Sequence, residues 1–233
     1  MRPFTARSGL TLLALLAAHA AQAGRPLQTE DAGVIDAGGC EIEGAHERLR
    51  ISGATARDTA LTFSCGIGWR SQVGITGSRS RADGESASGT ALGGKTRLWS
   101  AGDDGPALTV AWSLAWARAA GSWRHAEDEA RLVWSMPAGP GTLHLNLGHA
   151  RDRIERMSST PWGVGWEHGG VETGGLTLAP MAEVYGDGRG DHAWNVALRA
   201  TLVPERLFID GSYGRQTGSV GARLVTVGFK VTF

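Results

Sequence analysis

The last dozen residues of the chain, Ala222 to Phe233, place the strongest limit on its fold. Apolar residues alternate there with small or polar ones, and the apolar positions are Val225, Val227, Phe229, Val231 and Phe233. Strict alternation of β-branched and aromatic residues predicts a long β-strand. In a soluble protein a second sheet must cover such a face, whereas in a transmembrane barrel it faces lipid.

The first residues predict export. Arg2 and Arg7 precede an apolar run at residues 10–21, and Ala21-Gln22-Ala23 has the form of a signal-peptidase cleavage site. This pattern indicates a secretory signal peptide over residues 1–23. A membrane anchor is the weaker interpretation, because the run is shorter than the roughly 20 residues that span a bilayer as a helix.

The composition of the chain further limits the class of protein to which it can belong. The formal net charge is +0, which argues against a dedicated nucleic-acid partner. No other apolar run reaches the ~18 residues of a membrane helix. Glycine, at 35 residues, is about twice its usual share, while proline is only 8. This balance favours closely packed strands over a helical domain.

Alternation and turn residues together predict an all-β fold over residues 40–233, an antiparallel transmembrane up-and-down β-barrel of about 12 strands. An extended periplasmic lead-in is expected at residues 24–39. Short turns are expected at residues 69–71, 102–106, 137–141 and 204–205, and longer polar loops at residues 82–90 and 153–160. The strands are expected near residues 40–51, 59–67, 72–81, 91–100, 107–118, 124–136, 142–152, 161–168, 176–186, 192–203, 206–215 and 222–233.

Several of these strands carry charged residues at the alternate positions, on the face opposite their apolar face. A charge facing lipid costs about 2–4 kcal/mol near the bilayer midplane, so this phase is assigned to the lumen. Mixed signs suggest ion pairs that hold the interior together, or alternatively a pore lining that sets solute preference. The predicted lumen-lining residues are Glu41, Glu43, Lys95, Arg97, Glu129, Arg131, Glu183, Asn195, Arg199 and Lys230. The same phase also holds Thr109, Ser113, His144, Asn146, Glu167 and Asp210.

Two segments carry a family resemblance. Residues 25–33 read Arg-Pro-Leu-Gln-Thr-Glu-Asp-Ala-Gly, followed by Gly38-Gly39 and Cys40-Glu41-Ile42-Glu43, and residues 92–98 read Leu-Gly-Gly-Lys-Thr-Arg-Leu. They resemble the Gram-negative outer-membrane family named for the MetA pathway of phenol degradation. The resemblance implies an outer-membrane location and a transport role, with hydrophobic or aromatic solutes among the candidates.

The C-terminal strand resembles those of bacterial outer-membrane barrels. In these proteins a terminal Phe is part of the signal read by the barrel-assembly machinery. Phe233 is therefore the predicted assembly signal, and this machinery is an expected partner.

Cys40 and Cys65 are the two cysteines, and both fall in the apolar phase of neighbouring predicted strands. A turn at Ser52-Gly53 would place them opposite each other. Export and an even count favour a disulfide. Free thiols and a metal site are the alternatives, but no Cys-x-x-Cys or Cys-His cluster accompanies them.

An enzyme is the weaker functional class. His144, His149, His168 and His192 could act as bases, yet no serine stands in a recognisable motif with any of them. No cofactor is expected. Asp103-Asp104 and the loop at residues 187–191, which begins and ends with Asp, could bind a cation but are interpreted as solvated turns.

The expected function is that of an outer-membrane channel or facilitator for small molecules, with membrane lipid and a solute as partners. The alternative is a non-conducting structural or interaction barrel, filled by its own side chains and by residues 24–39. A third class is a soluble periplasmic β-sandwich.

Overall fold

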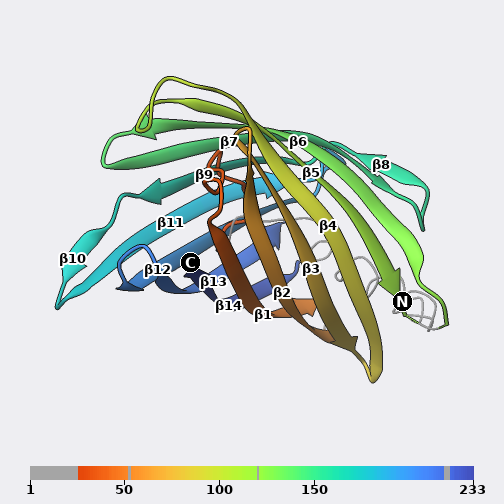
Figure 1. Ribbon diagram of the computed structural model, residues 1–233. Coiled ribbons are helices and arrows are strands. Elements are labelled where there is room, and N and C mark those ends of the chain that lie inside the picture. Colours follow the sequence, from red (N-terminus) through yellow and green to blue (C-terminus); the bar gives the residue numbers. More distant parts are fainter. Residues whose placement is uncertain (1–25, 52–53, 120, 218–220) are drawn as a thin grey trace.

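In the computed structural model the chain forms one closed β-barrel (Figure 1). The structure describes residues 26–51, 54–119, 121–217 and 221–233. The predicted signal peptide and the Ser52-Gly53 turn lie outside these residues. Within the described ranges, no helix is long and apolar enough to cross a membrane.

The described strands are long, and most run without interruption from one end of the barrel to the other. Their bounds are β1 Cys40–Ile51, β2 Ala54–Gly68, β3 Ser71–Ala82, β4 Glu85–Ser100, β5 Ala107–Arg118, β6 Arg124–Ala138, β7 Gly141–Asp152, β8 Met157–Ser159, β9 Trp162–His168, β10 Val171–Thr173, β11 Leu176–Gly186, β12 His192–Val203, β13 Leu207–Thr217 and β14 Arg223–Thr232.

The short strands β8 and β10 share one position in the wall with β9. β9 pairs with β7 and β11, while β8 extends the pairing along β7 and β10 extends it along β11. Pro161 lies in the break between β8 and β9, where its missing N–H interrupts no ladder. β14 pairs antiparallel with β1, so the sheet closes with twelve strands around its circumference. The predicted twelve-stranded antiparallel barrel is confirmed, and the soluble sandwich is excluded.

One expectation about the loops is wrong. The sequence predicted a long polar loop at residues 82–90, but β3 and β4 pair up to Ala82 and Glu85. Only Asp83 and Gly84 connect them, with φ values of 50° and 85°. Two successive positive φ values are typical of the type I′ turn that closes tight hairpins. The Ser and Ala residues after this turn therefore continue the strand.

The wall has its large apolar side chains outside and its polar ones inside. Leu61, Ile75 and Val227 are 55–56% exposed, whereas Ser80 and Thr109 are fully buried. Large apolar residues exposed all over one surface would be a liability in water. A lipid environment accounts for the pattern, because lipid covers the outside and polar groups line the interior.

The start of β1 and the C-terminus meet at the closing seam. The Cys40 N–H donates to the Phe233 carbonyl at 2.8 Å, and the Phe233 N–H donates to the Cys40 carbonyl at 2.9 Å. Cys40 lies directly opposite Cys65 and forms a disulfide with it, as predicted. This end of the barrel is called the terminal end, and the end that carries the Asp83-Gly84 turn is called the far end.

Candidate functional site in the barrel interior

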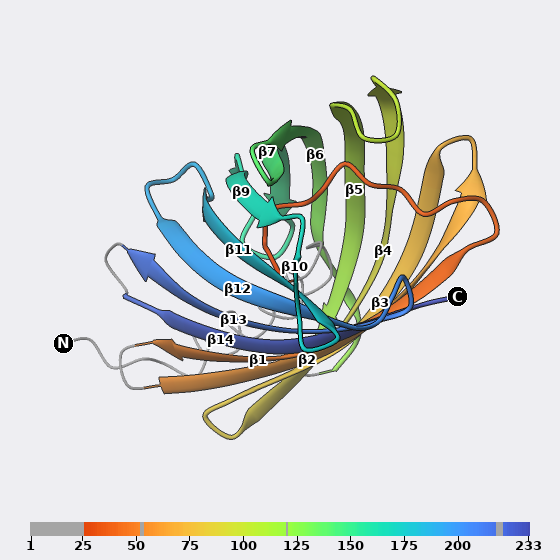
Figure 2. The same ribbon diagram turned by 90° about the vertical axis from the view of Figure 1, so that its left-hand side faces the viewer.

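Residues 26–36 lie inside the barrel and are called the luminal segment. Figure 2 shows this stretch, in red, crossing the interior before the chain turns into β1. Leu27, Thr29, Glu30 and Ala32 are at most 5% exposed. At the terminal end, Ala37 forms a parallel bridge with Gly66 of β2.

Wall side chains satisfy the backbone of the first part of the luminal segment. The N–H groups of Gln28 and Thr29 donate to the Glu183 carboxylate at 2.7–2.9 Å. The Asn195 amide donates both to Glu183, at 2.9 Å, and to the Pro26 carbonyl, at 3.3 Å. Glu183 and Asn195 were predicted to line the lumen. In the structure both form hydrogen bonds to the backbone of the luminal segment.

The later part is held in the same way, from four other strands. The Glu30 N–H donates to Asn146 Oδ1 at 2.7 Å, and Asn146 Nδ2 donates to the Glu30 carbonyl at 2.9 Å. The Ala32 N–H donates to Ser135 Oγ at 2.9 Å, and its carbonyl accepts from Thr109 Oγ1 at 2.8 Å. The Ile35 N–H donates to Gln72 Oε1 at 2.8 Å. A buried segment outside the sheet needs such partners, because unpaired backbone polar groups are costly to bury.

Glycines of the wall leave the space that the luminal segment fills. A Cβ added at Gly163 of β9 would lie 2.6 Å from Thr29 Oγ1, and one at Gly165 would lie 3.2 Å from Thr29 Cβ. A Cβ added at Gly66 would lie 2.1 Å from the Asp36 carbonyl oxygen. Part of the glycine enrichment noted in the sequence therefore makes room for residues 27–36.

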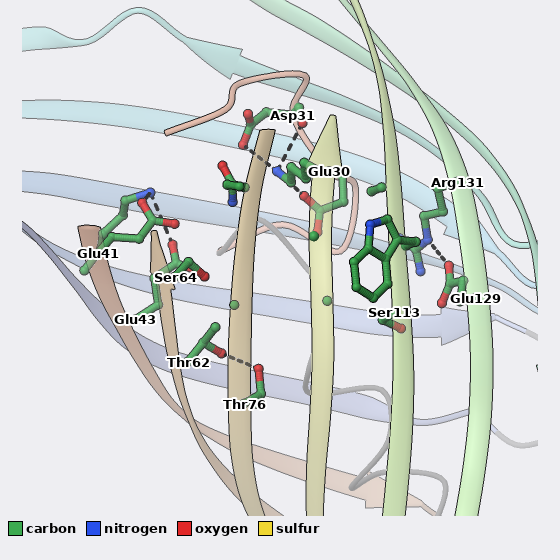
Figure 3. A pocket seen from close by; sticks show the side chains of 18 of the residues that line it. Glu30, Asp31, Glu41, Glu43, Thr62, Ser64, Thr76, Ser113, Glu129 and Arg131 are labelled. Atoms are coloured by element: carbon green, nitrogen blue, oxygen red, sulfur yellow. Dashed lines mark hydrogen bonds and ion pairs between the residues drawn. The ribbon is translucent and has the colours of Figure 1, made fainter. Parts of the chain in front are cut away.

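Ion pairs occupy the middle of the interior (Figure 3). Lys95 Nζ lies 2.5 Å from Glu30 and 3.7 Å from Asp31, both on the luminal segment. Lys230 Nζ lies 2.5 Å from Glu41 and 3.5 Å from Glu43. Arg131 pairs with Glu129 of its own strand, and Arg199 lies 3.8 Å from Glu167.

The side chains of Glu30 and Lys95 are both largely buried, so each charge depends on the other for a partner. Removing one of the two would leave an unpaired buried charge, which is costly. The pair therefore fixes the position of the luminal segment relative to β4.

The charged side chains of the wall surround a space in the interior. Glu41, Glu43, Lys95, Glu129, Arg131, Arg199 and Lys230 line one cavity of about 120 Å³, together with Glu30 and Asp31. This space is large enough for several water molecules. Toward the terminal end the interior opens into a wider space of about 630 Å³. Arg97, the next inward position after Lys95 on β4, is half-buried and lines neither space.

A serine–histidine contact that the sequence did not suggest lies beside the luminal segment. Ser135 and His144 are opposite each other on β6 and β7, and Ser135 Oγ is 2.8 Å from His144 Nδ1. His144 Nε2 lies 3.9 Å from Glu167. The Ser135 hydroxyl already accepts from the Ala32 N–H, and neither residue lines the cavity. The contact therefore orients Ser135 toward the luminal segment.

The described residues contain no group of three His, Cys, Asp or Glu side chains placed to hold a metal ion. At residues 187–191, the Asp187 carboxylate accepts from the Arg189 N–H at 2.9 Å and pairs with the Arg189 side chain at 3.2 Å. This geometry is that of a turn closed by its own side chains.

A family model described as "Uncharacterised conserved protein UCP029691" matches residues 11–233. The chain belongs to this family. A search of the curated proteins gave no match.

Solved structures of outer-membrane proteins share the fold. The KdgM porin in complex with disordered oligogalacturonate has a TM-score of 0.60 at 10% identity, over 83% of this chain and 99% of that one. The COG4313 outer membrane channel from Pseudomonas putida F1 has a TM-score of 0.60 at 11% identity, over 87% and 97%. The β domain of the Bordetella autotransporter BrkA has a TM-score of 0.53 at 15% identity, over 84% and 99%.

At these identities the likeness establishes the fold alone, which is that of outer-membrane barrels, including porins and channels. The fold supports an outer-membrane location and a lipid environment. None of the matches points to the MetA-pathway family in particular.

Proposed function

We propose that the protein is an outer-membrane channel for small hydrophilic solutes, and that its own luminal segment narrows the passage. The observation that carries the proposal is the charged interior, which holds a space of about 630 Å³ at the terminal end and one of about 120 Å³ beside Glu30. A charged space narrowed by the luminal segment favours ions and water over a sugar or an aromatic ring. Larger solutes therefore require residues 26–36 to move.

A preference for hydrophobic or aromatic solutes was also expected from the sequence. That expectation rests on the resemblance of residues 25–43 and 92–98 to the MetA-pathway family. The charged lining favours the hydrophilic alternative, since moving an apolar solute past Lys95, Glu129 and Arg131 gains no burial. Aromatic solutes are therefore the second group to test, after small ions and sugars.

Single-channel conductance in planar bilayers tests the proposal. The refolded mature chain is compared with a double variant, Gly163→Val with Gly165→Val, whose new side chains occupy the space of Thr29 and Leu27. The matched control is Gly211→Val, where the nearest atom to an added Cβ, the Thr226 carbonyl oxygen, is 3.8 Å away. We expect small steps from the wild type and the control, and several-fold larger steps from the double variant.

A chain that lacks residues 26–36 gives the second measurement. All proteins are first checked for the gel shift on boiling that a folded barrel gives. If the deleted chain folds and stays silent, the channel proposal fails. The non-conducting barrel would then be the better account, because a barrel that stays closed without residues 26–36 is filled by the side chains of its own wall.

A further inference from the structure

Six exposed arginines stand on the outer wall near the far end, and they are called the arginine rim. They lie on β1, β2, β3 and β5, in the same outward phase as Leu61 and Ile75. They are Arg48, Arg50, Arg57, Arg79, Arg81 and Arg118. On each strand they are placed beyond the apolar band, where the lipid surface of an outer-membrane barrel ends.

Strand register brings these like charges together. Arg57 is directly opposite Arg48 on one side and Arg81 on the other. One row closer to the apolar band, Arg79 and Arg118 are both opposite Ser88 of β4. Like charges directly opposite each other on one face of a sheet are destabilising, so the arrangement needs an anion to balance it.

Among the described residues, Asp83 and Glu85 line a hollow together with Arg57 and Arg81, but neither forms an ion pair with them. None of the ion pairs formed between described residues involves the arginine rim. Asp58, the neighbour of Arg57, is 5% exposed and accepts the Ser80 hydroxyl on the inner face. Arg118 lies over the Trp123 ring, 5.3 Å from its centroid, which holds its guanidinium beside the wall.

A hollow in the outer wall lies among four of these arginines and is called the rim groove. It measures about 960 Å³, and its lining includes Arg57, Arg79, Arg81, Arg118, Leu61 and Trp123. Its floor is made of small residues, among them Gly77, where nothing lies within 4 Å of an added Cβ. The groove is thus cationic toward the far end and apolar toward the membrane.

We propose that the rim groove binds a membrane lipid through the phosphate of its head group. Arginine binds phosphate oxygens with two parallel N–H donors, which gives it an advantage over other cations at such sites. A phosphate between Arg57, Arg79 and Arg81 balances their mutual repulsion, and the start of an acyl chain lies along Leu61 below it. The groove takes the lipid itself rather than free phosphate, because Leu61 and Trp123 line it beside the arginines and would contact an acyl chain.

The test measures lipid binding to the purified protein in neutral detergent by native mass spectrometry. The probes are bisphosphorylated lipid A, phosphatidylcholine and inorganic phosphate. The variant is Arg57→Gln, Arg79→Gln and Arg81→Gln combined. The matched control is Arg124→Gln, Arg156→Gln and Arg206→Gln combined, which removes the same charge from exposed positions outside the groove.

We expect lipid A to bind the wild type and the control alike, and the rim variant to bind it about a hundredfold more weakly. Phosphatidylcholine binding should be weaker and equal for all three proteins, and inorganic phosphate should not displace lipid A. Equal lipid A binding by the rim variant overturns the proposal, as does displacement by inorganic phosphate.

Gly77→Leu separates a shaped site from diffuse attraction. It places a side chain in the groove and keeps every arginine, and nothing lies within 4 Å of a Cβ added at Gly77. Loss of lipid A binding in this variant supports the rim groove. Unchanged binding would mean that charge alone attracts the lipid, and the groove would then be rejected as a site. The gel shift on boiling confirms that each variant is folded.

Discussion

The cations inside the barrel and those on its outer wall are balanced in different ways. Inside, Lys95 and Lys230 each lie 2.5 Å from a carboxylate of the chain, and Arg131 pairs with Glu129. Outside, Arg57 faces two other arginines across its neighbouring strands. The interior charges are largely buried, so partners within the chain stabilise them. The outer rim meets water and lipid head groups, which can supply anions from outside.

The difference also bears on function. Paired charges within the lumen hold the luminal segment in one position, as Glu30 does with Lys95. Unbalanced charges on the outside favour a ligand. The two surfaces should therefore respond in opposite ways to the same kind of substitution.

Lys95→Met gives the largest expected effect. It leaves the Glu30 carboxylate, 6% exposed at its side chain, without its partner. Breaking a buried pair on one side costs about 3–5 kcal/mol, so the free energy of unfolding should fall by about that much. Urea unfolding in detergent, followed by tryptophan fluorescence, measures it.

The control for this prediction is Arg79→Met on the outer wall, which should change stability by less than about 0.5 kcal/mol. Adding Glu30→Gln to Lys95→Met should restore much of the loss, because it removes the unpaired charge. An equal effect of the inner and outer single substitutions would refute the contrast between the two surfaces.

Much of the fold could be predicted from the sequence, because the two-residue period assigns every side chain of a strand to one face. The same period placed Cys40 and Cys65 on one face of neighbouring strands, where they form their disulfide. The far-end hairpins were harder to predict. Asp83-Gly84 is a turn signal, but Ser and Gly residues after it read equally well as loop or strand.

The interior was only partly predictable. The phase that holds Lys95, Glu129 and Lys230 could be read from alternation, but their partners could not. Glu30 and Asp31 lie in a segment without periodicity, and nothing local in that segment shows that it enters the barrel. Its position depends on acceptors from distant strands, such as Glu183 and Asn146, which only the closed fold brings together.

Glu183→Ala should have the second-largest effect and should act mainly on the luminal segment. It removes the acceptor of the Gln28 and Thr29 N–H groups. Leaving buried donors unpaired costs about 1–3 kcal/mol, so we expect the segment to detach while the barrel stays folded. Hydrogen exchange at these two amides should become faster.

Glu172→Ala, at an exposed position of β10, is the matched control and should leave both amides protected. Unchanged exchange in Glu183→Ala would mean that the segment is held by other contacts.

Arg57→Glu should have the smallest effect and the opposite sign. It places a carboxylate directly between Arg48 and Arg81, in register with both. Replacing a like-charged cross-strand pair by an opposite-charged one contributes about 0.2–1 kcal/mol, so this variant should be slightly more stable than the wild type in neutral detergent at low salt. The gain should disappear near 1 M salt, where exposed charges are screened within about 3 Å.

In detergent that contains lipid A, the order of stability should reverse, because the wild type gains a ligand that the variant repels. If Arg57→Glu lowers stability under all of these conditions, Arg57 already has a partner within the chain, and the outer wall is balanced in the same way as the interior.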